Sequence, residues 1–159
     1  MKKLVILLAT GFGLGYSPIA SGTVGTLPGV LIVAVVAMMP LLGIGWQIGL
    51  AIGLAALAVP ICHVAEKFFG KKDDRRIVAD EYLTFPLCVL GLPWPEHWWL
   101  LAVAFVVNRA MDVLKPPPAR QLQRLTGGLG IVIDDFFSCL YALAINHAIW
   151  WVVQRFTAL

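Results

Sequence analysis

The chain has 159 residues, of which 60% are hydrophobic and only 13% are charged, and its mean hydropathy is +0.86. Soluble domains average roughly 45–50% apolar residues, so this composition excludes an ordinary soluble domain. It favours one small integral membrane domain over residues 1–159. The formal net charge of +3 is small, and we expect the chain to associate with the lipid bilayer and not with nucleic acid.

The chain begins with MKKLVILLAT, which has the basic start and apolar core of a signal peptide. The core, residues 4–9, is shorter than the roughly 7–15 residues of such signals and runs directly into glycine-rich sequence. We therefore expect this segment to be retained. Cys62, Cys88 and Cys139 are isolated in apolar stretches without CxxC spacing, so we expect buried thiols, not disulfides or metal ligands.

Apolar runs separated by turn signals predict an all-α membrane bundle. The run over 27–69 is too long for one helix, since a span needs roughly 20 residues, and we place the break at Gly43–Gly45, after Pro40. The turn LPWPE must end another helix. The helices predicted in this way cover residues 27–42, 46–67, 78–92, 98–114 and 129–153.

These runs predict a small polytopic bundle of about four spans, in which the 78–92 run is a short hairpin partner. If the N-terminus is cytoplasmic and the helices alternate, the positive-inside rule fits all but one of the 12 bases. The bases on the cytoplasmic face are Lys2, Lys3, Lys67, Lys71, Lys72, Arg75, Arg76, Arg109, Lys115, Arg120 and Arg124. Arg155 alone falls outside.

Five carboxylates lie at the edges of the apolar runs, all on this predicted cytoplasmic face: Asp80, Glu81, Asp112, Asp134 and Asp135. Removing a carboxylate from water costs several kcal/mol unless cations or hydrogen bonds compensate, and such residues usually serve function. Converging carboxylates with few bases indicate a bound divalent cation. All-oxygen ligands favour Mg²⁺, with Mn²⁺ or Ca²⁺ as substitutes.

Several of these positions also have a structural interpretation. Asp80 and Glu81 would point about 100° apart on a helix. They are either metal ligands or the solvated start of a helix, where carboxylates suit the helix dipole. Asp112 and Lys115, three residues apart, form either an ion pair or a metal ligand beside a phosphate-binding base, a role open to Arg109 as well. For Asp134 and Asp135, which are flanked by apolar residues, the functional interpretation is the stronger one.

The segment LGYSPIASGTVGTLPG precedes the first long helix. Gly22 and Gly25 permit a tight loop, Thr26 can cap the helix, and Pro28 suits its first turn. Free N–H groups there favour a phosphate, although an ordinary capped helix entry explains the same residues. The histidines (His63, His97 and His147) lie on apolar helices or near the outer turn, so we expect structural roles and no zinc site.

These motifs resemble the phosphatidylglycerophosphatase A family over nearly the whole chain. The family pattern G-x-G-x-S-P-x-A-P-G-T-x-G-S is similar to Gly13, Gly15, Ser17, Pro18, Ala20, Gly22, Thr23 and Gly25, with Thr26 in the final serine position. Its D-P-x-x-I-V-x-D-E run resembles Asp73, Ile77, Val78, Asp80 and Glu81. Its F-R-x-x-D-I-x-K-P-x-P segment resembles Arg109, Asp112, Lys115, Pro116 and Pro118. Its G-G-x-G-I-M-x-D-D run resembles Gly127, Gly128, Gly130, Ile131, Asp134 and Asp135.

The chain departs from the family pattern at a few positions without losing a carboxylate or the lysine. Ser21 and Asp74 stand where the family has proline, and Val132 replaces a methionine. Thr84 and Cys139 replace glycines after D-E and D-D. The two lost glycines bear on helix contacts near the site and hence on substrate range.

The resemblance implies a multi-pass enzyme of the bacterial cytoplasmic (inner) membrane that uses Mg²⁺ to hydrolyse phosphatidylglycerophosphate to phosphatidylglycerol and phosphate. The five carboxylates would be the metal ligands and catalytic groups. The phosphate would be bound by Lys115, Arg109, Ser17, Gly22, Thr23, Gly25 and Thr26. Metal-activated water is preferred over an aspartyl-phosphate, because no D-x-D-x-T/V motif is present.

Three alternatives are weighed against this function. A transferase that uses a CDP-activated lipid should show D-G-x-x-A-R, which the sequence lacks. A cation-coupled transporter or non-enzymatic cation-binding scaffold should place polar groups deep in several helices, whereas these carboxylates cluster at one face. A phosphatase for another lipid phosphate differs only in substrate. The sequence does not indicate an oligomeric state.

The distribution of bases makes a prediction about topology. A cysteine introduced at Lys71 should be protected from a membrane-impermeant thiol reagent in intact cells, whereas one at Glu96 or Leu159 should react. Labelling is read on a background in which the three native cysteines are replaced. Labelling of position 71 in sealed cells would contradict the orientation.

Overall fold

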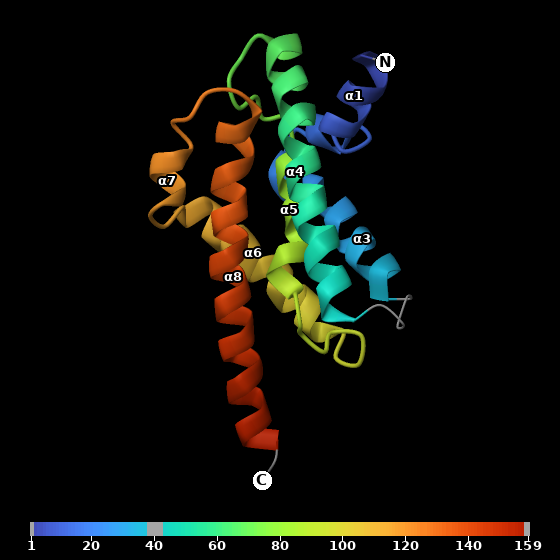
Figure 1. The fold of residues 1–159 in the computed structure, drawn as a ribbon, viewed down its shortest axis with the longest axis vertical. Helices are drawn as coiled ribbons and strands as arrows, with labels where there is room; N and C mark the ends of the chain where they lie inside the picture. Colours follow the sequence, from blue (N-terminus) through green and yellow to red (C-terminus); the bar gives the residue numbers. More distant parts are fainter. Residues whose placement is uncertain (1, 38–42, 158–159) are drawn as a thin grey trace.

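The computed structural model describes residues 2–37 and 43–157, and within these ranges the chain forms helices and turns and no strand (Figure 1). The α-helices are α1 (Lys2–Ala9), α2 (Ser21–Gly25), α3 (Leu27–Ala37), α4 (Ile44–Phe69), α5 (Ala79–Thr84), α6 (Trp99–Leu114), α7 (Ala119–Leu122) and α8 (Gly128–Thr157). Two 3-10 turns are η1 (Leu14–Tyr16) and η2 (Phe85–Val89). The prediction of an all-α fold is confirmed.

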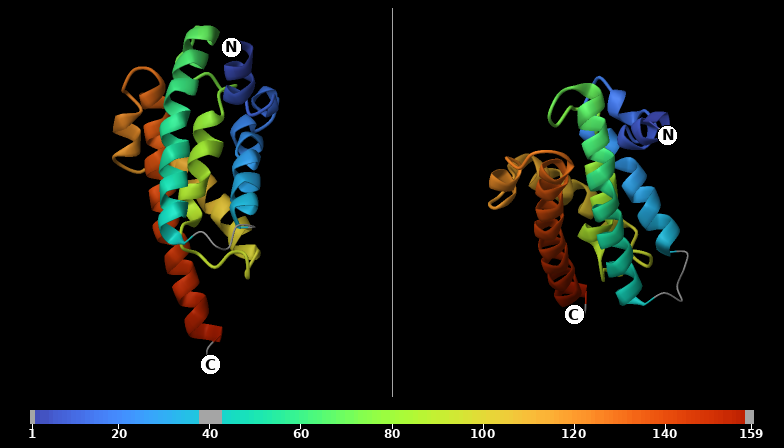
Figure 2. Two further views of the ribbon diagram at one scale, coloured as in Figure 1. Left: turned by 45° about the vertical axis from the view of Figure 1, so that its right-hand side comes forward. Right: turned by 45° about the horizontal axis from the view of Figure 1, so that its top comes forward.

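Among the described helices, α4 and α8 are long and apolar enough to cross a membrane, with 26 and 30 residues. They lie side by side, and the C-terminal part of α8 extends beyond the other helices (Figures 1 and 2). Large apolar side chains such as Leu31, Leu57 and Val106 are exposed on the outside. These features agree with the predicted membrane domain.

The predicted helix boundaries are close to those observed. Helix α4 extends two residues beyond each end of the predicted 46–67 span, and α6 begins one residue after the predicted start of 98–114. Helix α8 begins one residue before the predicted 129–153 span and runs four residues beyond its end. The predicted break at Gly43–Gly45 is wrong in detail, because Gly43 is the N-cap and Gly45 lies in the first turn of α4. Helix α3 follows the 27–42 prediction as far as Ala37, and residues 38–42 lie outside the described part.

The run predicted over 78–92 is not a continuous helix but α5 followed by η2. Pro86 has no N–H with which to continue the α-helical hydrogen bonds, and the Thr84 hydroxyl donates to the Asp80 carbonyl oxygen at 2.6 Å. This α5–η2 segment contacts α3, α4, α6 and α8. Phe85, Leu87 and nearly all its other residues are buried, so the segment forms the core of the bundle.

Two apolar clusters surround the α5–η2 segment. One packs α5 against the small side chains of α4, including Ala58, Cys62 and Ala65, which allow the helices a close approach. The other packs η2 against α6 and α8 and includes Cys88 and Cys139. All three cysteines are buried with free thiols, as expected from their apolar surroundings.

The N-terminal helix α1 is tied to the start of α5. The Val78 N–H donates to the Ala9 carbonyl oxygen at 2.8 Å, and the Tyr82 hydroxyl donates to the Leu8 carbonyl oxygen at 3.0 Å. Helices α1 and α7 lie in the same half of the molecule as the α4–α5 loop, and α8 ends in the opposite half (Figure 1). This grouping agrees with the predicted clustering of the bases.

A substitution at Gly128 tests the close contact of α4 with α8. A Cβ there would collide with the Val59 carbonyl oxygen and lie 2.6 Å from the His63 backbone nitrogen. Overpacking of this kind typically costs about 1–3 kcal/mol, so Gly128→Ala should lower the melting temperature in detergent. Gly53→Ala is the matched control, because a Cβ at Gly53 meets open space. This substitution also replaces a flexible residue inside a helix, which does not destabilise the fold. Equal melting temperatures for the two variants would contradict this packing.

Candidate active site

A polar cavity of about 270 Å³ lies where α2, α5, α6, α8 and the α4–α5 loop meet. Charged and small polar residues make up nearly all of its wall. Its lining residues are Ser21, Gly22, Asp73, Arg75, Ile77, Asp80, Glu81, Arg109, Asp112, Lys115, Asp134 and Asp135. The five carboxylates singled out from the sequence therefore share one cavity, although they come from three different helices.

The cavity carries an excess of negative charge. Six carboxylates line it against three bases. Asp80, Asp134 and Asp135 are each at most 6% exposed, and Asp80 Oδ1 and Asp134 Oδ1 are buried without a hydrogen-bond partner. Buried carboxylate oxygens without partners are strongly unfavourable, so this donor set is suited to an additional cation.

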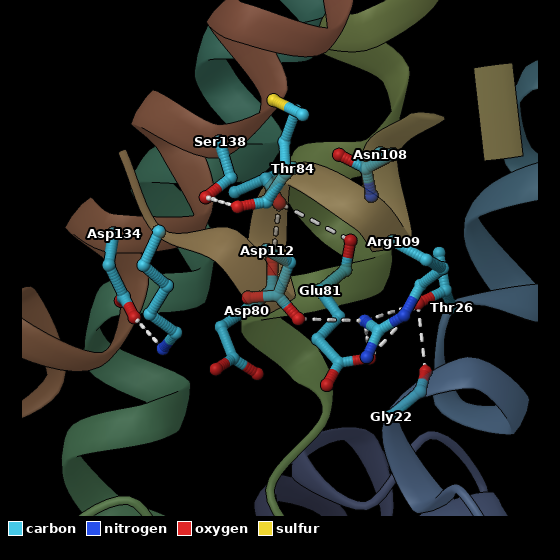
Figure 3. Close-up of polar contacts among 12 residues, drawn as sticks. Gly22, Thr26, Asp80, Glu81, Thr84, Asn108, Arg109, Asp112, Asp134 and Ser138 are labelled. Carbon is cyan, nitrogen blue, oxygen red and sulfur yellow. Dashed lines mark hydrogen bonds and ion pairs between the residues drawn. The ribbon is translucent and has the colours of Figure 1, made fainter. Parts of the chain in front are cut away.

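Arg109 of α6 organises one side of the cavity (Figure 3). Its Nη1 lies 3.0 Å from Glu81 Oε2 and 3.1 Å from Asp112 Oδ2, so one guanidinium joins α5 to α6. The Thr26 hydroxyl is 2.9 Å from the same Glu81 oxygen and 2.8 Å from the Gly22 carbonyl oxygen. On this side of the cavity, Glu81 and Asp112 are thus already held by protein groups.

Gly22 is needed because α2 approaches this ion pair with its backbone. A Cβ at Gly22 would collide with the Glu81 carboxylate and lie 2.6 Å from Arg109 Nη2. Any other residue would displace the guanidinium or the carboxylate. Gly22, singled out from the sequence, therefore allows the α2 backbone to lie close to the Glu81–Arg109 pair. The 21–25 segment is the short helix α2, not the predicted loop.

Other predictions for the 13–28 segment have mixed outcomes. Pro28 lies in the first turn of α3, as expected. Thr26 does not cap α3, because its hydroxyl turns back toward Gly22 and Glu81. Of the predicted phosphate-binding residues in this segment, only Gly22 lines the cavity, whereas Ser17, Thr23, Gly25 and Thr26 do not. Ser17 donates to the Ile19 carbonyl oxygen instead.

Lys115 organises the other side of the cavity. It caps α6 in the left-handed conformation, with φ 46°, which is an uncommon backbone for a non-glycine residue. Its ammonium pairs with Asp134 of α8. Burial opposes the charge on Lys115, but the hydrogen bond to Asp134 and the nearby carboxylates of Asp112 and Asp135 raise its pKa above the ordinary lysine value.

The ion pair considered between Asp112 and Lys115 is wrong. Asp112 pairs instead with Arg109, and Lys115 pairs with Asp134 of α8. The left-handed turn at Lys115 and the prolines that follow carry this residue away from the helical face it would share with Asp112. The two bases therefore hold different helices together.

The histidines lie outside the cavity. His147 contacts the Leu90 carbonyl oxygen at 2.8 Å, and His97 packs on Trp150 with ring centroids 4.7 Å apart. His63 faces Gly127 and Gly128. Within residues 2–37 and 43–157, no group of three or more histidine, cysteine, aspartate or glutamate side chains is placed so that it could hold a metal ion.

The cavity also contains residues that the sequence did not single out. Asp73 and Arg75 come from the α4–α5 loop, whose run of charges is typical of a solvated turn. Asp73 adopts the left-handed backbone, with φ 50°, which Asp tolerates better than most residues. The only signal in the sequence was the alignment of Asp73 with the first aspartate of a family motif.

Comparisons with known proteins agree with this arrangement of motifs. The sequence model described as Phosphatidylglycerophosphatase A matches residues 7–150. The chain belongs to this family. It is 35% identical over 146 residues to a phosphatidylglycerophosphatase A of Escherichia coli, which covers 90% of this chain and 81% of that protein. A Haemophilus influenzae protein of the same name is 33% identical over 160 residues, 96% of each chain.

A further relative has a different name. A Bacteroides thetaiotaomicron protein, whose name proposes a phosphatidylinositol-3-phosphatase, is 30% identical over 153 residues, which cover 94% of this chain and 96% of that protein. No solved structure matches the chain.

The structure explains three departures from the pattern of the phosphatidylglycerophosphatase A family. Thr84 and Cys139, at the two glycine positions, are fully buried between the core helices. Their polar atoms are satisfied, because the Thr84 hydroxyl donates to Asp80 and the Cys139 thiol to Asn108 Oδ1 at 3.2 Å. Asp74, at a proline position, holds the α4–α5 loop by accepting from Arg76.

The Asp74–Arg76 pair makes a prediction about pH. Arg76 Nε and Nη2 lie 2.7 and 3.0 Å from the two Asp74 oxygens, and this hydrogen bonding holds the pKa of the Asp74 carboxyl below its ordinary value. The stabilisation is present above the unfolded-state pKa and disappears as pH falls through the lowered folded-state pKa. Because Arg76 is 36% exposed, solvent screens the pair and the gain in stability is small.

Asp74→Asn should therefore lower the melting temperature at pH 7, and its difference from wild type should shrink as the buffer is acidified past the ordinary carboxyl pKa. Thermal unfolding in detergent between neutral and acidic pH measures this difference. Glu96→Gln, at an exposed residue of the opposite end, is the control. A gap for Asp74→Asn that persists in acid would contradict the role of this ion pair.

Proposed function

We propose that the chain is a lipid phosphomonoesterase that hydrolyses phosphatidylglycerophosphate to phosphatidylglycerol and phosphate in phospholipid biosynthesis. The observation that carries the proposal is the cavity itself, in which Lys115 and Arg109 lie among six carboxylates inside a bundle with apolar outer surfaces. The reaction needs neutralisation of a phosphate dianion more than a strong nucleophile. The family and the names of two relatives support this substrate.

A second candidate substrate comes from the Bacteroides relative, whose name refers to a phosphorylated inositol lipid. Both named lipids contain a phosphodiester next to the diacylglycerol and a phosphomonoester farther out on the headgroup. We propose this class of lipid as the substrate range, with phosphatidylglycerophosphate preferred because two relatives carry its name.

Magnesium is the proposed cofactor. Mg²⁺ usually retains several waters and takes only one or two carboxylates from a protein, so Asp80 and Asp134, each with an unpartnered buried oxygen, are suited to begin its ligand shell. Waters would fill most of the remaining positions, with Asp135 as a further candidate ligand. Glu81 and Asp112 would join only by sharing their contacts with Arg109. The ion would supply charge neutralisation and an acidified water.

The protein's own groups would bind and orient the phosphate. The Lys115 ammonium has three N–H donors, of which one serves Asp134, so the others are available to phosphate oxygens. Arg109 Nε is buried without a partner and has a donor to offer, while Nη1 keeps α5 and α6 in position. Attack by water fits the absence of a D-x-D-x-T/V motif and stays preferred over an aspartyl-phosphate.

The proposed location is the bacterial cytoplasmic membrane, with the cavity open to the cytoplasm. The positive-inside distribution supports this orientation. The α4–α5 loop, which lines the cavity, also lies at the same end of the structure as α1 (Figure 2). A site at headgroup depth would leave the diacylglycerol part in the bilayer and release phosphate to the cytoplasm. About four spans are proposed, including α4 and α8.

Two aspartate variants test this function. Asp134→Asn and Asp135→Asn keep the size of the side chain but remove charge, so phosphate release from phosphatidylglycerophosphate should fall by roughly 100-fold or more if the residues hold the cation. The unliganded variants should be as stable as wild type or more so, since buried like charges are relieved. Added Mg²⁺ should raise the melting temperature of wild type but not of the variants.

Lys115→Met is the contrasting variant. It should weaken turnover and substrate binding but leave the Mg²⁺-induced rise in melting temperature, because the lysine is assigned to phosphate and not to the metal. Loss of that rise in Lys115→Met would contradict this division of roles. Full wild-type activity after exhaustive chelation would contradict the metal itself.

A further inference from the structure

A second polar cavity, of about 410 Å³, lies between the α4–α5 loop and α7. It is lined by Lys72, Asp73, Arg120, Gln123 and Arg124. Three of these five residues are cations, whereas carboxylates dominate the first cavity. The lining of the second cavity therefore favours an anionic ligand.

This basic cavity is held in shape by Gln123. Its backbone carbonyl oxygen accepts from Lys72 Nζ at 3.0 Å, and its side-chain Nε2 donates to Asp73 Oδ2 at 3.1 Å. These bonds join parts of the chain about fifty residues apart. The wall is thus a defined contact between α7 and the α4–α5 loop and not a chance grouping of surface bases.

The positive charges of the basic cavity are not neutralised. Arg120 of α7 and Arg124, which follows the end of that helix, take part in none of the ion pairs found among the described residues, and neither does Lys72. The single carboxylate, Asp73, is engaged by Gln123. Two guanidinium groups and an ammonium around one cavity are suited to a phosphate group.

The basic cavity adjoins the active-site cavity, because Asp73 lines both of them. A ligand that carries two phosphate groups could therefore place one in each. The proposed lipids have this chemistry: the phosphomonoester would enter the first cavity, and the phosphodiester is separated from it only by the glycerol or inositol of the headgroup.

We propose that Lys72, Arg120 and Arg124 form a subsite for a second phosphate group. This inference rests on the proposed function for the identity of the ligand. The phosphate is either the diester of the lipid substrate or the free phosphate released by the reaction, and both are bound by the same three bases. In the first case the subsite selects lipids with two phosphates over those with a monoester alone.

The test uses the double variant Arg120→Gln/Arg124→Gln in the full chain, reconstituted in phosphatidylcholine vesicles. Two substrates with identical acyl chains are compared: phosphatidylglycerophosphate, with both phosphates, and phosphatidate, with only a monoester. KM for the first should rise about tenfold, as expected for the loss of two exposed ion pairs. The KM of phosphatidate, or its inhibition constant if it is not hydrolysed, should change less than twofold. kcat should be little affected.

A second measurement separates the two sources of phosphate. If the subsite binds free product, the double variant should lose noncompetitive inhibition by inorganic phosphate while KM for phosphatidylglycerophosphate stays unchanged. Either result supports the subsite. An equal effect on both lipids, or no change in KM and in phosphate inhibition, overturns it.

Lys71→Gln is the matched control, since it removes a positive charge from the same loop at an exposed residue that lines neither cavity. An effect of this variant equal to that of the double variant would indicate a general attraction to anionic lipid and would contradict a defined subsite. Calorimetric binding of short-chain forms of the two lipids repeats the comparison without turnover. Wild-type protein that binds both lipids but hydrolyses neither would contradict the proposed function and leave the subsite open to this binding test.

Discussion

The burial of α5 is the constraint on which the rest of the structure depends. This helix is only six residues long, yet it is surrounded by α3, α4 and α8 and carries Asp80 and Glu81 into the interior. Such charges are tolerated only where cations or hydrogen bonds reach them. Arg109 satisfies Glu81, whereas Asp80 keeps an oxygen without a partner. The bundle therefore surrounds buried negative charge, which the described protein groups compensate only in part.

Several small residues in the motifs serve this burial. Gly22 lets α2 approach the Glu81–Arg109 pair, and Gly128 lets the first turn of α8 lie against the backbone of α4. Where the family pattern has two further glycines, this chain has Thr84 and Cys139, whose polar atoms bond inside the bundle. The contacts beside the carboxylates are thus filled by side chains without leaving those polar atoms unsatisfied.

The sequence predicted the helical class, most helix boundaries and the meeting of five carboxylates, because apolar run length and burial cost are local properties. It did not predict which base would pair with which acid, since Arg109–Glu81 and Lys115–Asp134 depend on how distant helices pack. The inward position of Asp73 was missed for the same reason. The interruption at Pro86 is different, because its missing N–H is a local signal that the prediction of one helix over 78–92 overlooked. A loop whose charges line a site has the same composition as a loop whose charges only face water.

Gln123 has a consequence for how such enzymes diversify. It holds α7 against the α4–α5 loop through Lys72 and Asp73. It thereby sets the spacing between the active-site cavity and the basic cavity that we propose binds the second phosphate of the headgroup. The two are carried by different elements, since α7 contributes nothing to the first cavity. Relatives with longer or bulkier headgroups as substrates could then arise by remodelling the 116–127 connection alone, with the reaction centre left intact.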